Sequence, residues 1–372
     1  MRFTIKREEL LKALNIASKA VASKSAIPVL INFKLELNEE GLVIIGSNGD
    51  LIIRTVVPYT IGDAEVIRNY KEGATLINAK IILEIARKIE SDELTFEVVD
   101  STIATVSDNK ASEYTLNCVR PEEYPDLDLD PDGSELILTT ADFALMVDQT
   151  AFATSLKRPV LSAINLEASD GLLTATATDA ARMAKKIMSV PLDVEFNANI
   201  PAKTMVEVSH LLEGSPSVTL SISSNKALFI FGKTTVSTRL IAEDYPNTSN
   251  IVPRVTNFTL EVNAQDLIKA IDRANILSID RENVVDLTMS EEGVEVSAKS
   301  SQVGSASERI DTFRYEGGEL RISFNSEFVT SAVRALGSED VTFMFVGEMK
   351  PFVIKNLNDE SVVQVVTPVR TH

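Results

Sequence analysis

The sequence of 372 residues contains no tryptophan, one cysteine and two histidines. A lone cysteine, Cys118, cannot form an internal disulfide bond, so we expect a protein of the reducing cytoplasm. Two histidines and one cysteine far apart cannot supply a zinc site of standard spacing. Histidine is also the usual acid or base near neutral pH, and His210 lies on a predicted helix, as a surface or partly buried side chain. We therefore predict no metal, no cofactor and no catalytic residue.

Long hydrophobic runs are also missing. No apolar segment approaches the roughly 18 residues that a membrane helix needs, and the first residues form no apolar signal segment. We expect neither membrane attachment nor secretion. Hydrophobic residues make up 44% of the chain and charged residues 24%, which is typical of globular proteins. The length predicts two or three domains.

Two local motifs resemble ligand sites but lack essential positions. Gly232-Lys233-Thr234 looks like the end of a phosphate-binding loop, yet Ala227 stands where that loop needs a glycine. The flanking residues alternate as the two strands of a hairpin do. The acidic segment 128–133 opens like a calcium loop, but Thr139 stands where the closing glutamate is required. We interpret the first as a turn and the second as a solvated linker.

The chain repeats itself three times. Segments 3–14, 136–147 and 258–271 each consist of a short alternating strand followed by an amphipathic helix. A second strand and helix recur in each third, with helices near 79–90, 202–213 and 326–337. The Tyr-Pro pairs at Tyr124 and Tyr245 lie 121 residues apart, a period far above that of solenoid repeats.

These repeats predict an α+β fold of three tandem domains, each with two β-α-β-β-β-like halves. The predicted boundaries are 1–127, 128–253 and 254–372. The acidic stretch 126–133 and the segment 251–254 are the predicted linkers.

The net charge of −18 opposes nucleic-acid binding, because DNA affinity usually comes from lysine and arginine. The charge is unevenly distributed, however. The six predicted helices carry 14 basic and 12 acidic residues, a net of +2, so the remainder of the chain sums to −20. For this count the helices are taken as residues 7–24, 80–90, 141–158, 202–213, 264–281 and 326–337. If these helices lined one surface, it would be neutral to mildly basic on an acidic body. The helix residues that we consider for contact with DNA are Lys12, Lys19, Lys24, Lys80, Arg87 and Lys88.

Beyond the threefold repeat, four motifs carry a family resemblance: Arg158-Pro159-Val160-Leu161, the segment 178–184, the two Tyr-Pro pairs, and a tail with Pro368 and Arg370. In this order and spacing they resemble the bacterial DNA polymerase III β subunits, the β sliding clamps, over essentially the whole chain. The resemblance implies a head-to-tail homodimer that forms a ring around double-stranded DNA, with helices inside and sheets outside. It implies as partners the clamp loader, the replicative DNA polymerase catalytic subunit and other proteins with clamp-binding peptides.

The same resemblance places a peptide-binding pocket between the second and third domains, and a subunit interface. The implied pocket is apolar with a few polar groups, which suits a peptide with hydrophobic anchors. This chain has Ala180-Ala181 where the family often has Gly-His or Gly-Tyr, and Asn250 where the family often has a basic residue. The implied pocket residues are Leu161, Thr178, Ala180, Arg182, Met183, Pro246, Ile251, Met349, Pro351, Val365, Pro368, Val369 and Arg370. The implied interface residues are Ile85 and Tyr114 of the first domain and Ile276 and Leu277 of the third.

Two other functions fit the sequence. An acidic, carboxylate-dependent enzyme, such as a hydrolase with a divalent metal bound by dispersed carboxylates, would need two paired carboxylates with a raised pKa in one cleft. A repeat protein that binds only other proteins would show no retention on closed circular DNA. The clamp hypothesis predicts a binding protein without chemistry of its own.

Overall fold

The computed structural model describes residues 1–372 except 23, 25, 109, 279–282 and 371–372. The chain divides into two compact units. The first unit contains residues 1–140 and 207–240, and the second contains residues 141–206 and 241–372. The middle third of the sequence therefore contributes one part to each unit.

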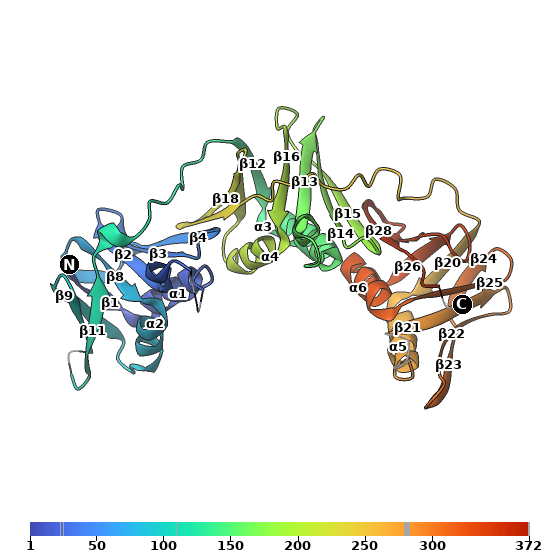
Figure 1. Cartoon of the computed structure of the whole chain (residues 1–372), viewed down its shortest axis with the longest axis horizontal. Helices are drawn as coiled ribbons and strands as arrows, with labels where there is room; N and C mark the ends of the chain where they lie inside the picture. The colour runs from blue at the N-terminus through green and yellow to red at the C-terminus, as the bar shows by residue number, and fades with distance from the viewer. Residues whose placement is uncertain (23, 25, 109, 279–282, 371–372) are drawn as a thin grey trace. The chain divides into compact units, whose positions relative to one another are not determined.

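A 13-stranded antiparallel sheet forms the first unit, together with the small β5–β6 pair (Thr60–Ile61 and Ala64–Glu65). Helices α1 (Arg7–Ser18) and α2 (Ala79–Lys88) pack against each other and against this sheet (Figure 1). In spatial order the strands are β12 (Ser134–Thr139), β17 (Ser217–Ile222), β18 (Lys226–Phe231), β19 (Thr234–Arg239), β4 (Leu51–Val57), β3 (Gly41–Ser47), β2 (Asn32–Asn38), β8 (Gly73–Asn78), β11 (Glu113–Val119), β10 (Ile103–Ser107), β9 (Glu93–Asp100), β1 (Arg2–Lys6) and β7 (Ile67–Lys71).

The second unit contains a nine-stranded and a four-stranded sheet. Helices α5 (Ala264–Asn275) and α6 (Ser326–Leu336) pack together on a core of buried aliphatic and phenylalanine side chains. The nine strands are β16 (Phe196–Pro201), β13 (Ala163–Ser169), β14 (Leu172–Thr178), β15 (Arg182–Ser189), β28 (Asp359–Val366), β27 (Phe352–Asn356), β26 (Asp340–Phe345), β20 (Phe258–Asn263) and β24 (Phe313–Glu316). The four are β23 (Gly304–Ile310), β22 (Gly293–Ser300), β21 (Val284–Ser290) and β25 (Leu320–Asn325).

The repeat predicted from the sequence is present in all three thirds. The six halves read β1-α1-β2-β3-β4, β8-α2-β9-β10-β11, β12-α3-β13-β14-β15, β16-α4-β17-β18-β19, β20-α5-β21-β22-β23 and β25-α6-β26-β27-β28, where α3 is Thr140–Thr150 and α4 is Ala202–Leu211. Asparagine side chains cap three of the helices. Asn78, Asn263 and Asn325 each accept a hydrogen bond from a backbone N–H of the first turn, which satisfies donors that a helix leaves free.

Three helices are shorter in the structure than the sequence predicted. The segments 7–24, 141–158 and 264–281 were expected to be helical throughout, but their helices end at Ser18, Thr150 and Asn275. Each end has a hydroxyl that binds a carbonyl of the last turn: Ser18 to Asn15, Thr150 to Met146 and Ser278 to Asn275. Such side-chain bonds compete with the helical backbone ladder. Residues 279–282 lie outside the described residues.

One rule of strand pairing occurs twice in the chain. In each case, the last strand in the first half of one repeat pairs antiparallel with the last strand in the second half of the next repeat. The two pairs are β4 with β19, and β15 with β28 (Figure 1 shows the second pair). These ladders join consecutive repeats into continuous sheets. The two remaining strands of this kind are β23 and β11. In the described part of the chain β23 pairs only with β22, and β11 pairs with β10 and, through Cys118 and Val119 alone, with β8.

Candidate functional site

A cavity of about 280 Å³ lies in the second unit, where β14, β15 and β28 meet the 3-10 helix Pro159–Ser162 and the loop before β20. Most of its exposed wall is apolar. The residues around it are Arg158, Leu161, Thr178, Ala180, Arg182, Met183, Pro246, Thr248, Ile251, Val365 and Thr367.

The turn between β14 and β15 builds one wall. Oδ1 of Asp179 accepts hydrogen bonds from the backbone N–H groups of Ala181 and Arg182, both at 2.9 Å. The Thr178 hydroxyl donates to the Arg182 carbonyl at 2.6 Å and accepts from the Ala180 N–H at 3.1 Å. Ala180 is held at φ +76°, a left-handed conformation that is costly for any residue with a Cβ atom. The wall is therefore fixed by its own hydrogen bonds, at the cost of local strain.

The second Tyr-Pro pair holds the same turn from outside. The Tyr245 hydroxyl accepts a hydrogen bond from the Thr178 N–H at 3.0 Å, and burial raises the pKa of Tyr245 to about 12. Pro246, the next residue, lines the cavity. The motif thus connects the end of one repeat to the wall of the cavity.

Arg182 has its guanidinium between two phenyl rings. Its Cζ atom lies 5.4 Å from the centre of the Phe152 ring and 4.5 Å from the centre of the Phe328 ring. Its Nε atom donates to Oδ2 of Asp179 at 2.9 Å, and both side chains of this ion pair are largely buried. Because Phe328 belongs to α6, Arg182 connects the β14–β15 turn to the last third of the chain.

The floor is a small apolar cluster. Met183, Val353 and Val365 are each 2% exposed, and Ile251 and Val252 of the loop before β20 pack on them. A loop side chain and buried strand residues thus form a shallow hydrophobic depression, of the kind that accepts an apolar side chain.

The structure brings eight of the thirteen predicted pocket residues around this one cavity. The other five do not line it: Met349 and Pro351 are in the β26–β27 loop, and Pro368, Val369 and Arg370 follow β28. The Val369 N–H donates to the Ser323 carbonyl, so the tail runs along β25. Three lining residues were missed, Arg158, Thr248 and Thr367. Each is adjacent to, or two residues from, a proline of a motif already singled out.

Most of the basic residues considered for DNA contact have carboxylate partners. Lys12 pairs with Glu8 and Glu9, both at 3.0 Å, and Lys19 pairs with Glu207 of α4 at 2.9 Å. Arg87 and Lys88 both pair with Glu84. Lys24 and Lys80 have no ion pair within the described residues. These carboxylates all lie on the predicted helices and are already included in their net charge of +2, so the pairs show only which basic side chains have a partner.

The four predicted interface residues differ in exposure. Tyr114 on β11 is 38% exposed and Ile276, just after α5, is 68% exposed. Leu277 is half-buried in the same turn. Ile85 is 8% exposed and belongs to the core beneath α1 and α2, so it can offer little surface to a partner.

The motifs set aside in the sequence have ordinary structural roles. Gly232 and Lys233 form the turn between β18 and β19, with Gly232 at φ +53°, and His210 is exposed. The acidic linker is anchored by Lys226, which pairs with Asp128 and Asp132. No group of three or more histidine, cysteine, aspartate or glutamate side chains among the described residues could hold a metal ion. No helix in the described part of the chain is long and apolar enough to cross a bilayer.

Family models match the chain in three consecutive segments. They are the N-terminal, central and C-terminal domains of the DNA polymerase III beta subunit, at residues 1–128, 137–247 and 249–370. The chain belongs to the family of β sliding clamps. Its fold is accordingly three tandem clamp domains, and its family provides a processivity factor for DNA polymerase and not a catalytic subunit.

Clamps of several bacteria resemble this chain over their full length. The beta sliding clamp of Bacillus subtilis is 32% identical over 379 residues, and that of Halalkalibacterium halodurans 33% over 381, with both chains covered completely. The crystal structure of the Bacillus subtilis clamp superposes with a TM-score of 0.95 at 31% identity, and that of the Streptococcus pneumoniae beta chain with 0.94 at 30%. Both superpositions cover each chain completely.

Proposed function

We propose that two copies of this chain close head to tail into a ring around duplex DNA, with helices inside and sheets outside, and tether polymerases to it. The observation that carries this proposal is the strand-pairing rule. It joins repeat one to repeat two through β4 and β19, and repeat two to repeat three through β15 and β28. Applied once more, it pairs β23 of one copy with β11 of the next. Two copies then form a closed cycle of six clamp domains.

The edges of β23 and β11 support this pairing. A strand with a free row of N–H and C=O groups is a template for another chain. Tyr114 on β11 and Ile276 beside α5 are large, exposed apolar side chains that a partner would cover. Ile85, which is already buried, contributes through the core behind the interface.

Weak attraction to DNA is consistent with a ring. Retention comes from topology, so the protein needs no tight phosphate contacts and can slide. Lys24 and Lys80, which have no ion pair among the described residues, are the residues that we expect to approach phosphates most often. The other four basic residues, Lys12, Lys19, Arg87 and Lys88, would have to leave their carboxylate partners to bind phosphates, which costs free energy.

The apolar cavity beside Met183 and Val365 is the proposed docking site for peptides. Its occupants are the replicative polymerase catalytic subunit, the clamp loader and other proteins with clamp-binding peptides, all in the cytoplasm. A peptide with one or two apolar side chains would fill the cavity, and its backbone would meet the polar groups of Thr178, Arg182 and Thr367.

Retention on circular DNA tests the ring. The protein is loaded onto nicked circular duplex by a clamp loader and ATP, the complex is isolated by gel filtration, and the DNA is then cut once. We expect the protein to stay on the circle and to leave after cutting. Failure to co-elute with the circle, or equal retention after cutting, contradicts the ring.

A matched pair of variants tests the strand pairing. Proline removes a backbone donor, so Ser307→Pro on β23 should convert the dimer to monomer, whereas Ser307→Ala should not. Sedimentation velocity measures both. A dimeric Ser307→Pro variant that has lost the β22–β23 hairpin, judged by hydrogen exchange, would place the interface elsewhere.

A further inference from the structure

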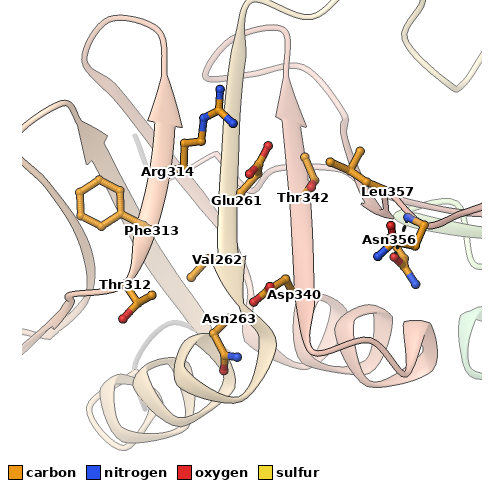
Figure 2. Close-up of a pocket in the computed structure, with 11 residues that line it drawn as sticks. Glu261, Val262, Asn263, Thr312, Phe313, Arg314, Asp340, Thr342, Asn356 and Leu357 are labelled. Carbon is orange, nitrogen blue, oxygen red and sulfur yellow. Dashed lines mark hydrogen bonds between the residues drawn. The ribbon is translucent and has the colours of Figure 1, made fainter.

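A second cavity, of about 380 Å³, lies on the nine-stranded sheet (Figure 2). It is lined by β20, β24 and β26 and by the turn between β27 and β28. None of the thirteen predicted peptide-binding residues lines it. Its polar lining includes two carboxylates, Glu261 and Asp340, and the hydroxyl of Thr342.

The charges in this cavity are unbalanced. Within the described residues neither Glu261 nor Asp340 has an ion pair, whereas the one cation of the lining, Arg314, pairs with Glu316 at 2.9 Å. Figure 2 shows the Glu261 carboxylate between the strands that carry Arg314 and Thr342. The cavity therefore favours a positively charged guest.

Thr342 gives an independent indication of a ligand. The residue is only 4% exposed and lines the cavity, yet its hydroxyl has no hydrogen-bond partner among the described residues. The oxygen is not one of the fully enclosed side-chain oxygens that lack a partner, so it is open to the cavity and a donor in the cavity can reach it. A donor that entered the cavity would satisfy this oxygen and a carboxylate together.

Both cavities lie on the same face of the same sheet. Val365 of the first cavity is level with Val353 on β27, and Val353 is level with Met344 on β26. Thr342 lies two residues from Met344 and is level with Glu261, so alternation along the strand places them on the same face. The three strand steps from β28 to β20 span about 14 Å and the two-residue step about 7 Å, which about five extended residues cover.

We propose that the second cavity binds a lysine or arginine side chain of a partner whose apolar anchor occupies the first cavity about five residues away. This inference rests on the proposed peptide docking and assigns its specificity. The basic group would bind the Glu261 carboxylate and the Thr342 hydroxyl, with Asp340 adding negative potential. Lys355 on β27 is level with Thr342 and is also positively charged. The basic side chain of the partner therefore has to extend beyond Lys355 to reach the Glu261 carboxylate.

The test uses the full-length clamp and synthetic peptides. Overlapping 15-residue peptides that cover the replicative polymerase of the same organism identify a parent peptide that shifts the methyl NMR signals of Met183 and Val365. Truncation from each end locates the apolar anchor of this parent, and one arginine is then placed five residues before or five residues after the anchor, across Gly-Ser residues. The control carries citrulline, a neutral side chain of the same shape. Affinities are measured by fluorescence anisotropy, and the Thr342 methyl signal reports occupancy of the second cavity.

One arginine extension should bind about tenfold more tightly than its citrulline control, because charge-assisted hydrogen bonds are strong. This ratio should fall toward one in Glu261→Gln, fall partly in Thr342→Val and shrink with salt. It should persist in Glu360→Gln, which removes an exposed carboxylate of β28 that does not line the cavity.

The outcomes separate the two proposals. If no parent peptide shifts the signals of Met183 and Val365, the docking site itself is wrong. If a parent binds but arginine and citrulline give equal affinities, or Glu261→Gln leaves their ratio unchanged, the second cavity is not a subsite. The citrulline comparison needs no variant and stands even if Glu261→Gln folds poorly.

Discussion

Replacing Arg182 by methionine should loosen the β14–β15 turn without emptying the space between the phenyl rings. Methionine keeps an unbranched stem between Phe152 and Phe328, but it loses the guanidinium and its bond to Asp179. Asp179→Asn removes the charge of the partner while its Oδ1 can still accept from the backbone of the turn. Together the two substitutions isolate the ion pair.

The expected cost follows from the contacts. A hydrogen bond between charged groups contributes about 1.5–3 kcal/mol, and each cation–π contact about 0.5–1 kcal/mol. Part of this is offset because a guanidinium no longer has to be desolvated. We expect Arg182→Met to lower the free energy of local opening by about 2 kcal/mol and Asp179→Asn by about 1 kcal/mol. The double variant should lose about 1 kcal/mol less than the sum, since the pair can be broken only once.

Hydrogen exchange of the backbone amides in β15 measures this opening. A loss of about 2 kcal/mol corresponds to roughly 30-fold faster exchange. Local exchange is preferable to global unfolding, because a chain of several domains does not unfold in one step. Arg182→Lys, which keeps the charge but not the planar group, should fall between methionine and wild type.

Additive effects of the two substitutions, within about 0.5 kcal/mol, would refute the reasoning. So would unchanged exchange in Arg182→Met, because the ion pair and the ring contacts would then contribute nothing to holding the turn.

Three further predictions concern the β14–β15 turn and the start of β28. Ala180→Gly should raise the free energy of unfolding by about 0.5 kcal/mol, since relief of the left-handed conformation slightly exceeds the entropy cost of glycine; thermal denaturation measures it. Tyr245→Phe should leave the Thr178 N–H unpaired and cost about 1–2 kcal/mol, seen as faster exchange of that amide. The side-chain hydrogen bond from Ser361 lowers the pKa of Asp359, so its stabilisation is present above pH about 4 and lost as the pH falls further; Asp359→Asn should flatten that part of the pH–stability curve.

Each of these predictions has a contrary result. A lower melting temperature in Ala180→Gly would mean that the turn does not store strain. Normal protection of the Thr178 amide in Tyr245→Phe would show that another acceptor replaces the hydroxyl. An Asp359→Asn variant with the same acid sensitivity as wild type would assign the loss to other carboxylates.

The fold could be predicted from the sequence because the repeat is strong. Strand and helix periods alternate six times, and all six strand–helix units are present. The ends of three helices could not be predicted, because Ser18, Thr150 and Ser278 bind carbonyls of the preceding turn. Whether a hydroxyl bonds back in this way depends on the local packing, which hydrophobic periodicity does not report.

The walls of the candidate site were predicted through the family resemblance and not from composition. The pairing of the basic residues was missed. Lys19 and Glu207 are 188 positions apart, and only the strands that join consecutive repeats bring their helices together. The second cavity was also missed, because Glu261, Thr342 and Arg314 meet through sheet register and share no sequence motif. Charges counted along a chain do not indicate which of them remain free.

The pairing of β4 with β19 and of β15 with β28 has a consequence for assembly. A rule that attaches each repeat to the next contains no signal to stop, because every added copy offers the same free strand as the one before. Only the angle between successive repeats determines whether growth returns to its start. If copies join through the proposed pairing of β23 with β11, a substitution that alters this angle, without touching either edge strand, would yield open filaments in place of closed particles, visible by electron microscopy.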